Sequence, residues 1–99
     1  MPTAIITGHK GFIGSHLFNR LKEMNWLIFG MDLPIDVTDK YNWEQSLIGR
    51  NIDYIFHLAG HLDKYYQGDG EADFSKYLDI NAKSVALMFE VIVENKLPI

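Results

Sequence analysis

The sequence predicts an α/β protein in which helices cover both faces of a short parallel sheet of about three strands. Two observations predict this three-layer architecture. Short, continuous apolar segments alternate with segments whose apolar residues recur at helical spacing. The resulting order, a strand followed by a helix three times over, requires parallel strands joined by right-handed crossovers. Residues 1–99 contain no repeat, linker or low-complexity segment, so we expect them to form a single domain.

Each predicted element has a local signal. The uniformly apolar segment 3–7 is typical of a strand buried on both faces, and Gly8 ends it. The helix that follows can end at Asn25. Thr38 or Asp39 is a suitable N-cap for a short helix that ends before Gly49. The predicted strands are 3–7, 26–31 and 52–58, and the predicted helices cover 11–24, the residues from this N-cap to about 48, and 72–95, with a polar loop at 61–70.

A glycine-rich loop lies between the first predicted strand and the first predicted helix. Gly8 can make the tight turn, Gly11 can let the backbone approach a pyrophosphate, and Gly14 can let the helix pack closely on the sheet. The helix N-terminus offers N–H groups and a partial positive charge to phosphates. Asp32 follows Gly14 by 18 residues, where a carboxylate holds the ribose hydroxyls of a dinucleotide. This combination predicts a nucleotide site, with a βα turn that binds no ligand as the alternative.

The residues around Asp32 favour NAD over NADP as the cofactor. A carboxylate at this position repels the 2′-phosphate of NADP, and no arginine follows it to neutralise that phosphate. His9 and Lys10 complicate the choice, because either cation could lie near a phosphate. Both could equally be solvated loop residues.

These motifs resemble the extended short-chain dehydrogenase/reductase family, which includes nucleotide-sugar epimerases and dehydratases. The segment 7–17 is similar to the family's cofactor loop, and 36–39 (Asp-Val-Thr-Asp) resembles the acidic motif whose first two residues approach the adenine. The segment 57–60 (His-Leu-Ala-Gly) resembles one that lines the cofactor after a strand. The resemblance implies a truncated Rossmann-like fold and the cofactor-binding residues Gly8, His9, Lys10, Gly11, Phe12, Ile13, Gly14, Asp32, Asp36, Val37, Leu58, Ala59, Gly60 and Asn81.

The sequence also departs from that family. A helix and a strand normally separate the ribose-binding acid from the adenine motif, but here Asp36 follows Asp32 after three residues. That unit is therefore expected to be deleted, which leaves the strands in the order second, first, third. The family's catalytic serine or threonine and its Tyr-x-x-x-Lys pair would follow residue 99, and no tyrosine here has a lysine four residues on. Because that lysine tunes the tyrosine for proton exchange with the substrate, we expect no catalysis by this chain alone.

Three functional hypotheses follow. The chain is the NAD-binding part of a nucleotide-sugar epimerase or dehydratase that needs a complementing chain, or a non-catalytic dinucleotide-binding regulator, or an interaction or scaffold protein without a ligand. The intact glycines and Asp32 favour the first two. A metal site at His57, His61 and Asp63 is not favoured, because the two histidines do not share a helix face.

Composition indicates the setting of the protein. The net charge of −4, without a basic run, argues against nucleic acid and anionic membranes as partners. The absence of cysteine, of a signal-peptide pattern and of a membrane-spanning apolar segment leads us to expect a cytoplasmic protein.

Two surfaces are expected to support a homodimer. In the last helix, Phe89 is expected to help cover the sheet. A second apolar stripe on that helix would then stay exposed, consisting of Ile80, Leu87 and Val91. The strand at 54–58 would form an uncovered sheet edge, which invites pairing with another chain.

Overall fold

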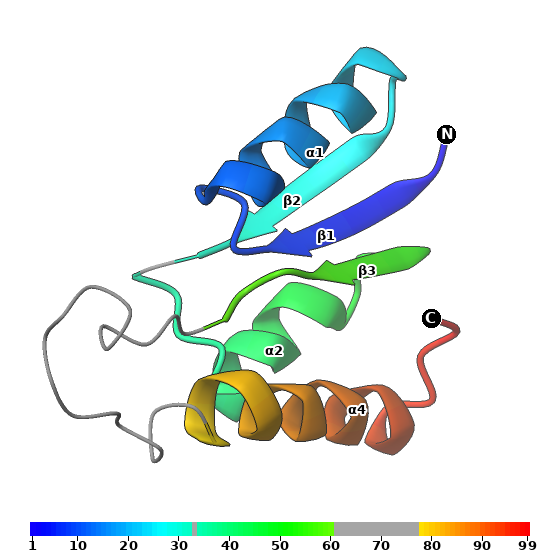
Figure 1. Ribbon diagram of the computed structural model, residues 1–99. Coiled ribbons are helices and arrows are strands. Elements are labelled where there is room, and N and C mark those ends of the chain that lie inside the picture. The colour runs from blue at the N-terminus through cyan, green and yellow to red at the C-terminus, as the bar shows by residue number, and fades with distance from the viewer. Residues whose placement is uncertain (33, 61–77) are drawn as a thin grey trace, which may run out of the picture.

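The computed structural model describes residues 1–32, 34–60 and 78–99, without the side chains at 78 and 79. The strands are β1 (Thr3–Thr7), β2 (Leu27–Met31) and β3 (Tyr54–His57) (Figure 1). The helices are α1 (Phe12–Glu23), α2 (Lys40–Leu47) and α4 (Ser84–Glu94), the last preceded by a π-helical turn, η2 (Leu78–Lys83). The predicted loop at 61–70 and the predicted helical residues 72–77 lie outside the described residues.

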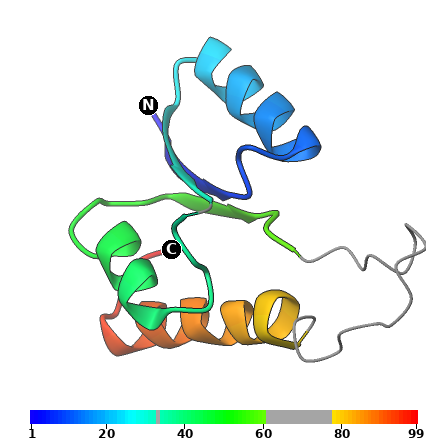
Figure 2. The ribbon, with the colours of Figure 1, turned by 90° about the vertical axis from the view of Figure 1, so that its left-hand side faces the viewer.

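The three strands form one parallel sheet in the order β2-β1-β3, which confirms the predicted α/β class and strand order. Helix α1 covers one face of the sheet, and α2 and α4 cover the other (Figures 1 and 2). Thr7, the last residue of β1, is in register with Met31 of β2 and His57 of β3. The loops that follow the three strands therefore start side by side at one edge of the sheet.

The predicted cap residues lie where the structure ends α1 and begins α2. Asn25 takes a left-handed φ of 65°, and the N–H of Trp26 reaches back to the Leu21 carbonyl at 3.1 Å, so α1 closes where the sequence predicts. The Asp39 side chain accepts from the N–H of Tyr41 at 3.0 Å and is the N-cap of α2. Gly49, at φ +82°, turns the chain after α2 towards β3.

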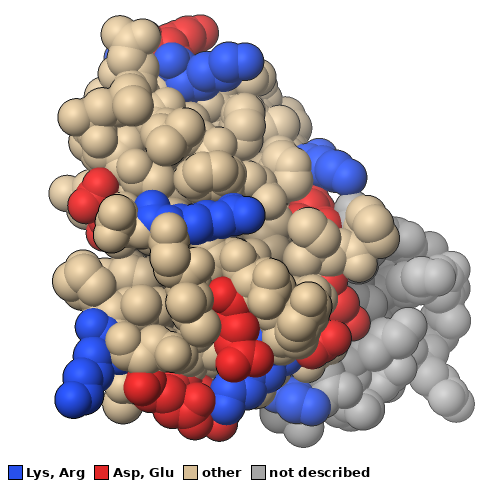
Figure 3. Space-filling model, turned by 180° about the vertical axis from the view of Figure 1, so that it is seen from behind, with Lys and Arg blue, Asp and Glu red and all other residues tan. Residues whose placement is uncertain are grey.

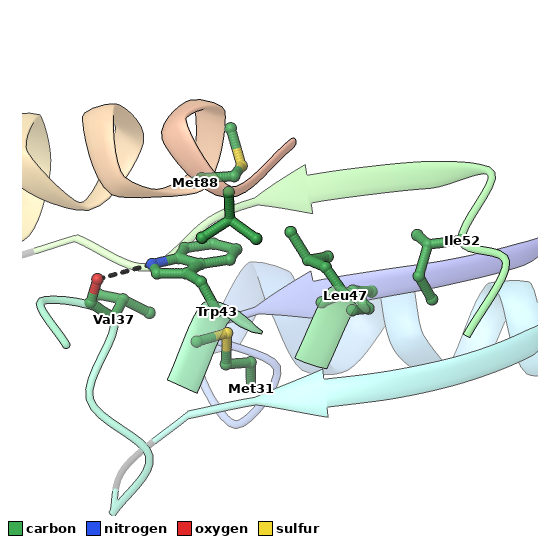
Figure 4. Close-up of a cluster of buried hydrophobic side chains, with 8 residues drawn as sticks. Met31, Val37, Trp43, Leu47, Ile52 and Met88 are labelled. Carbon is green, nitrogen blue, oxygen red and sulfur yellow. Dashed lines mark hydrogen bonds between the residues drawn. The ribbon is translucent and has the colours of Figure 1, made fainter. Parts of the chain in front are cut away.

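The hydrophobic core lies between the sheet and the α2–α4 layer, and Trp43 of α2 is at its centre (Figure 4). The indole is fully buried, and its Nε1–H donates to the Val37 carbonyl at 2.8 Å, which satisfies the polar end of the ring. The remaining buried members are Ile5, Met31, Val37, Leu47, Ile52, Met88 and Val91. Through Met31 and Val37, this core supports the segment that connects β2 to α2.

The apolar faces of α4 differ from the prediction. Val91, expected to be exposed, is fully buried, and Leu87 packs against the core. Phe89, expected to cover the sheet, is 56% exposed. The reason is that α2 lies alongside α4, so residues from both predicted faces of α4, Val85 and Ile92 as well as Leu87 and Val91, contact the Trp43 cluster (Figure 1).

Charged side chains on the outer surface are of mixed sign. Lys40 of α2 forms ion pairs of 2.9 Å with both Glu90 and Glu94 of α4. On the face seen in Figure 3, basic side chains are interspersed with acidic and uncharged ones. No helix in the described part of the chain is long and apolar enough to cross a membrane.

Candidate functional site

A cleft of about 290 Å³ opens where the loops after the three strands meet. This is the position at which open α/β sheets bind ligands, outside the carboxyl ends of the strands on either side of the central one. The predicted residues that line it are Gly8, Gly11, Asp32, Asp36, Val37, Leu58, Ala59 and Gly60. Met31, Ile35 and Ile80 also line it and were not predicted. Their apolar character is the same as that of core residues, so the sequence gives no signal that separates the two roles.

The three loop glycines converge on the carbonyl of Gly8. Gly8 itself has φ +69°, and its N–H donates to the Met31 carbonyl at 2.8 Å. The N–H of Gly11 donates to the Gly8 carbonyl at 3.0 Å. A Cβ on Gly14 would lie 2.1 Å from the same oxygen, so only glycine fits there. Gly14 therefore lets α1 approach the turn itself rather than the face of the sheet.

The N-terminus of α1 faces this loop without a side-chain cap. Gly11 is the N-cap residue, no side chain accepts from the first turn, and that turn contains no acidic residue. The partial positive charge of the helix end is therefore not compensated by a carboxylate within the helix. Phe12 and Ile13, the first residues of α1, are exposed and do not line the cleft.

Asp32 lies at the rim of the cleft directly after β2. One carboxylate oxygen of Asp32 accepts from the backbone N–H of Lys10 at 3.0 Å, which ties the acid to the glycine loop. The N–H of Ile35 donates to the Asp32 carbonyl at 2.8 Å, so the chain reverses direction at once. This reversal brings Asp36 and Val37 to the same cleft after only three intervening residues.

Asp36 is held ionised by its own turn. One of its carboxylate oxygens accepts from the N–H of Thr38 at 2.8 Å and from the Thr38 hydroxyl at 2.7 Å. The hydrogen bond from the Thr38 backbone, followed by that from its side chain, lowers the pKa of Asp36 below its usual value of 3.8.

His9 does not point into the cleft. Its ring lies over Gly30 of β2, where a Cβ would meet ring atoms at 2.4 Å, and it is 5.7 Å from the Phe18 ring. The Nδ1 atom is buried and has no hydrogen-bond partner among the described residues. The sequence allows His9 to be a phosphate neighbour or a solvated loop residue, and in the structure its ring packs against β2. Its ring packs there because Gly30 leaves the space of a side chain open on that face of β2.

A partly buried chain of hydrogen bonds runs behind the cleft and was not predicted. The His57 ring lies between the Thr7 hydroxyl, 2.7 Å from Nδ1, and the Ser84 hydroxyl, 2.9 Å from Nε2. Thr7 also accepts from the N–H of Ala59 at 3.0 Å, and the Ser84 hydroxyl donates to the Ile80 carbonyl. Burial lowers the pKa of His57 below its usual value of 6.5, so the ring is neutral at pH 7.

The donors and acceptors of this chain fix the tautomer of His57. Because the Ser84 hydroxyl gives its proton to Ile80, it accepts from His57, which places the ring proton on Nε2. The neutral ring then accepts at Nδ1, so the Thr7 hydroxyl donates to it. From the Ala59 N–H to the Ile80 carbonyl, each group therefore donates one hydrogen bond to the next group in the series.

Asn81 lies near the cleft but does not line it. The residue is exposed, and its Oδ1 is close to Gly60, where a Cβ would lie 3.3 Å from that oxygen. Of the remaining predicted residues, Lys10 is exposed and contributes its backbone N–H to Asp32. Among the described residues, no three His, Asp or Glu side chains form a potential metal site. His61 and Asp63 lie outside those residues.

A central parallel strand that leads through a glycine loop into a helix, with an acid after the neighbouring strand, defines the Rossmann class of α/β proteins. The chain belongs to the NAD-dependent epimerase/dehydratase family, whose model matches residues 4–98. The family resemblance seen in the motifs is therefore confirmed.

Solved structures superpose on most of this chain. UDP-glucose 4-epimerase from Bifidobacterium longum, solved with NAD⁺ and UDP, has a TM-score of 0.81 at 23% identity and covers 97% of this chain and 35% of its own. UDP-glucose 4-epimerase from Thermus thermophilus, solved with NAD, has a TM-score of 0.80 at 17% identity over 96% and 35%. MoeE5, solved with UDP-glucose and NAD, has a TM-score of 0.73 at 27% identity over 93% and 32%. The chain thus spans about a third of the length of these proteins.

Proposed function

We propose that this chain binds NAD in the cleft between the glycine loop and the loops after β2 and β3. The observation that carries the proposal is that one cleft is lined by Gly8, Asp32 and Asp36, next to the uncapped N-terminus of α1. The helix end and Gly11 suit a pyrophosphate, and Asp32 suits the ribose hydroxyls. Asp36 and Val37 are assigned to the adenine. Leu58, Ala59 and Gly60 are assigned to the rest of the dinucleotide, with Asn81 beside them.

NAD rather than NADP is the proposed cofactor. The Asp32 carboxylate is held at the rim by the Lys10 N–H, where it would repel a 2′-phosphate. The structures solved with NAD from Thermus thermophilus and Bifidobacterium longum support a nicotinamide dinucleotide as the ligand class.

We further propose that this chain alone turns over no substrate. None of its tyrosines has a lysine four residues on, and without that pair a hydroxyl of the substrate has no matched proton acceptor. A nucleotide sugar would then be a substrate only together with a complementing chain, in the cytoplasm that the cysteine-free sequence suits. A non-catalytic regulator that binds NAD is the second candidate, favoured by a cleft lined by Gly8, Asp32 and Asp36 in a chain without that pair.

The experiment is a calorimetric titration of NAD, NADH, NADP and NADPH into the purified chain and its Asp32→Ala variant. Glu23→Ala is the matched control, since Glu23 is an exposed carboxylate at the far end of α1. We expect NAD to bind, Asp32→Ala to weaken it roughly 10-fold or more through the loss of charge-assisted hydrogen bonds, and Glu23→Ala to leave it unchanged. Failure of the unaltered chain to bind any dinucleotide at millimolar concentration would overturn the proposal.

A catalytic role is tested separately from binding. Addition of a candidate complementing protein should restore epimerisation or dehydration of a nucleotide sugar if the chain is part of an enzyme. Turnover by the isolated chain would contradict the proposal that it is inactive alone.

A further inference from the structure

Two walls of the cleft are joined through the side chains of Thr7, His57 and Ser84, and not only through the backbone. Ala59, after β3, and Ile80, on η2, both line the cleft. The Ala59 N–H and the Ile80 carbonyl are the two ends of the chain of hydrogen bonds that passes through His57. Thr7 and Ser84 within that chain are fully buried, so water cannot replace their partners.

Ser84 lies where the helix changes its winding. The π-helical turn η2 ends at Lys83, and α4 begins at Ser84. The Ser84 hydroxyl donates to the carbonyl of Ile80, four residues earlier. In an α-helix that carbonyl would accept from the backbone N–H of residue 84 instead. A serine bond of this kind often bends a helix, and π-helical turns in proteins are frequent at functional sites.

We propose that His57 and Ser84 are positioning residues for the cofactor cleft, holding η2 in its π-helical form so that Ile80 lines the cleft and Asn81 lies against Gly60. This inference rests on the proposed binding of NAD. Neither side chain lines the cleft, and each acts through the backbone that it holds. The change from π- to α-helical winding shifts the register by one residue, a rotation of about 100° around the helix axis. Asn81 would then leave Gly60.

The surroundings of His57 favour a neutral imidazole ring that is held in one orientation between Thr7 and Ser84. Its ring contacts Thr7 of β1, Ser84 of α4 and Trp43 of α2, whose ring is 5.6 Å away edge to face. None of these three side chains carries a charge at neutral pH. Hydrogen bonding alone therefore decides which group donates and which accepts along this series of hydrogen bonds. Protonation of Nδ1 would leave the Thr7 hydroxyl without its acceptor and break that order.

The test compares Ser84→Ala, His57→Leu and His57→Gln with a control, Ser46→Ala, in which a serine of α2 outside the network is changed. NAD affinity is measured by calorimetry between pH 5 and 8, and amide hydrogen exchange is measured across Leu78–Lys83. We expect Ser84→Ala and His57→Leu to weaken NAD binding roughly 3- to 10-fold and to speed exchange in η2. His57→Gln, which offers one donor and one acceptor, should bind NAD more tightly than His57→Leu.

The pH profile separates positioning from general destabilisation. The unaltered chain should lose affinity for NAD as the pH falls from 7 towards 5, and His57→Gln should not share that loss. Equal effects of Ser84→Ala and Ser46→Ala, or unchanged affinity and exchange in Ser84→Ala, would overturn the inference. If the unaltered chain binds no NAD, the proposed function fails. The hydrogen exchange of η2 and the ¹⁵N shifts of His57, which report the Nε2–H tautomer, then decide the positioning role by themselves.

Discussion

Gly14 shows how one carbonyl can determine the sequence of a loop. Its α-carbon lies so close to the Gly8 oxygen that a Cβ would come within 2.1 Å of it, and the neighbour is backbone rather than a flexible side chain. The glycine is therefore required by packing inside the protein, whatever ligand binds beside it.

We expect Gly14→Ala to lower the free energy of unfolding by about 2–3 kcal/mol, because α1 must move away from the turn. Gly11→Ala should cost less than about 1 kcal/mol, since its Cβ would lie 3.3 Å from the same oxygen and its φ of −75° suits any residue. Urea denaturation of both variants measures the difference. Equal losses would show that the loop relaxes and that the close approach is not rigid.

His9 and Gly30 form a second residue pair that excludes a side chain. The imidazole occupies the place that a Cβ on Gly30 would take. We expect Gly30→Ala to destabilise the fold by about 1–3 kcal/mol through overpacking. In His9→Ala/Gly30→Ala the same alanine should cost much less, because the ring is gone. A double-mutant cycle by thermal or urea unfolding checks this, and additive losses would contradict the packing seen here.

At the scale of elements, His57 links β3 to β1 and α4, and this makes the fold sensitive to mild acid. Burial lowers the pKa of His57 in the folded protein below the 6.5 expected of the unfolded chain. Between these two values the unfolded chain binds more protons, so stability falls as the pH falls below 6.5. The loss is complete once the pH lies below the folded-state pKa.

We expect the melting temperature of the unaltered chain to drop between pH 7 and pH 5 by more than that of His57→Gln. Asp36 and Glu90 have lowered pKa values through bonds to Thr38 and Lys40, and their usual values are 3.8 and 4.5. Their contributions are lost mainly below about pH 5 and are the same in both proteins, so they do not obscure the difference made by His57. Scanning calorimetry at half-unit pH steps measures it, and parallel curves for the two proteins would exclude His57 as the cause.

Most elements could be predicted from the sequence because their signals are local. Asn25 and Gly49 adopt the left-handed backbone that ends a helix, Asp39 begins one through its side chain, and the structure follows each of them. The exposed face of α4 could not be predicted, since the position of α2 decides it and helical periodicity contains no information about the neighbour. Trp43 on α2 draws Val91 inward and leaves Phe89 outside.

In the candidate site too, features with a local sequence signal could be predicted and features that depend on packing could not. Gly8 and Asp32 could be placed at one cleft because the carboxyl ends of parallel strands meet, and Asp36 could be placed there because of the family resemblance. The His57–Ser84 contact joins residues 27 positions apart, across the undescribed segment, and no motif marks it. The position of the His9 ring likewise depends on the lack of a side chain at Gly30 in β2.

For the whole molecule, the sheet has two outer edges and one partly open face. Tyr54 and Phe56 of β3 lie beside Trp26, with ring centroids 5.4 and 6.5 Å from the indole, and Tyr54 is 51% exposed. Helix α1 lies on this side of the sheet, next to β1 and β2 (Figure 2). Within the described residues, this aromatic patch beside the β3 edge supports the expectation that a second copy of the chain binds there.

We expect the chain to self-associate and Tyr54→Lys to weaken that association, because a charge at the edge opposes strand pairing. Val93→Lys is the matched variant on α4, where Val93 is 72% exposed, and it tests the helix as the alternative interface. Sedimentation velocity over a range of concentrations distinguishes the two. A monomer at all concentrations would refute the homodimer, and loss of association only in Val93→Lys would assign it to the helix.

The reversal of the chain between Asp32 and Ile35 has a consequence for how the cleft assembles. Because of this reversal, all the groups proposed to contact the adenosine part of NAD lie between Gly8 and Val37, in the β1–α1–β2 unit and the turn that follows it. The opposite end requires Thr7 to meet His57, 50 residues away in sequence, and Ser84 beyond it. Contacts of low sequence separation form at a smaller cost in loop-closure entropy than those of high separation, so they are expected to form sooner. The two ends of the cleft therefore differ in contact order. We expect an adenine nucleotide alone to bind the adenosine end in molecules in which the opposite end has not yet formed.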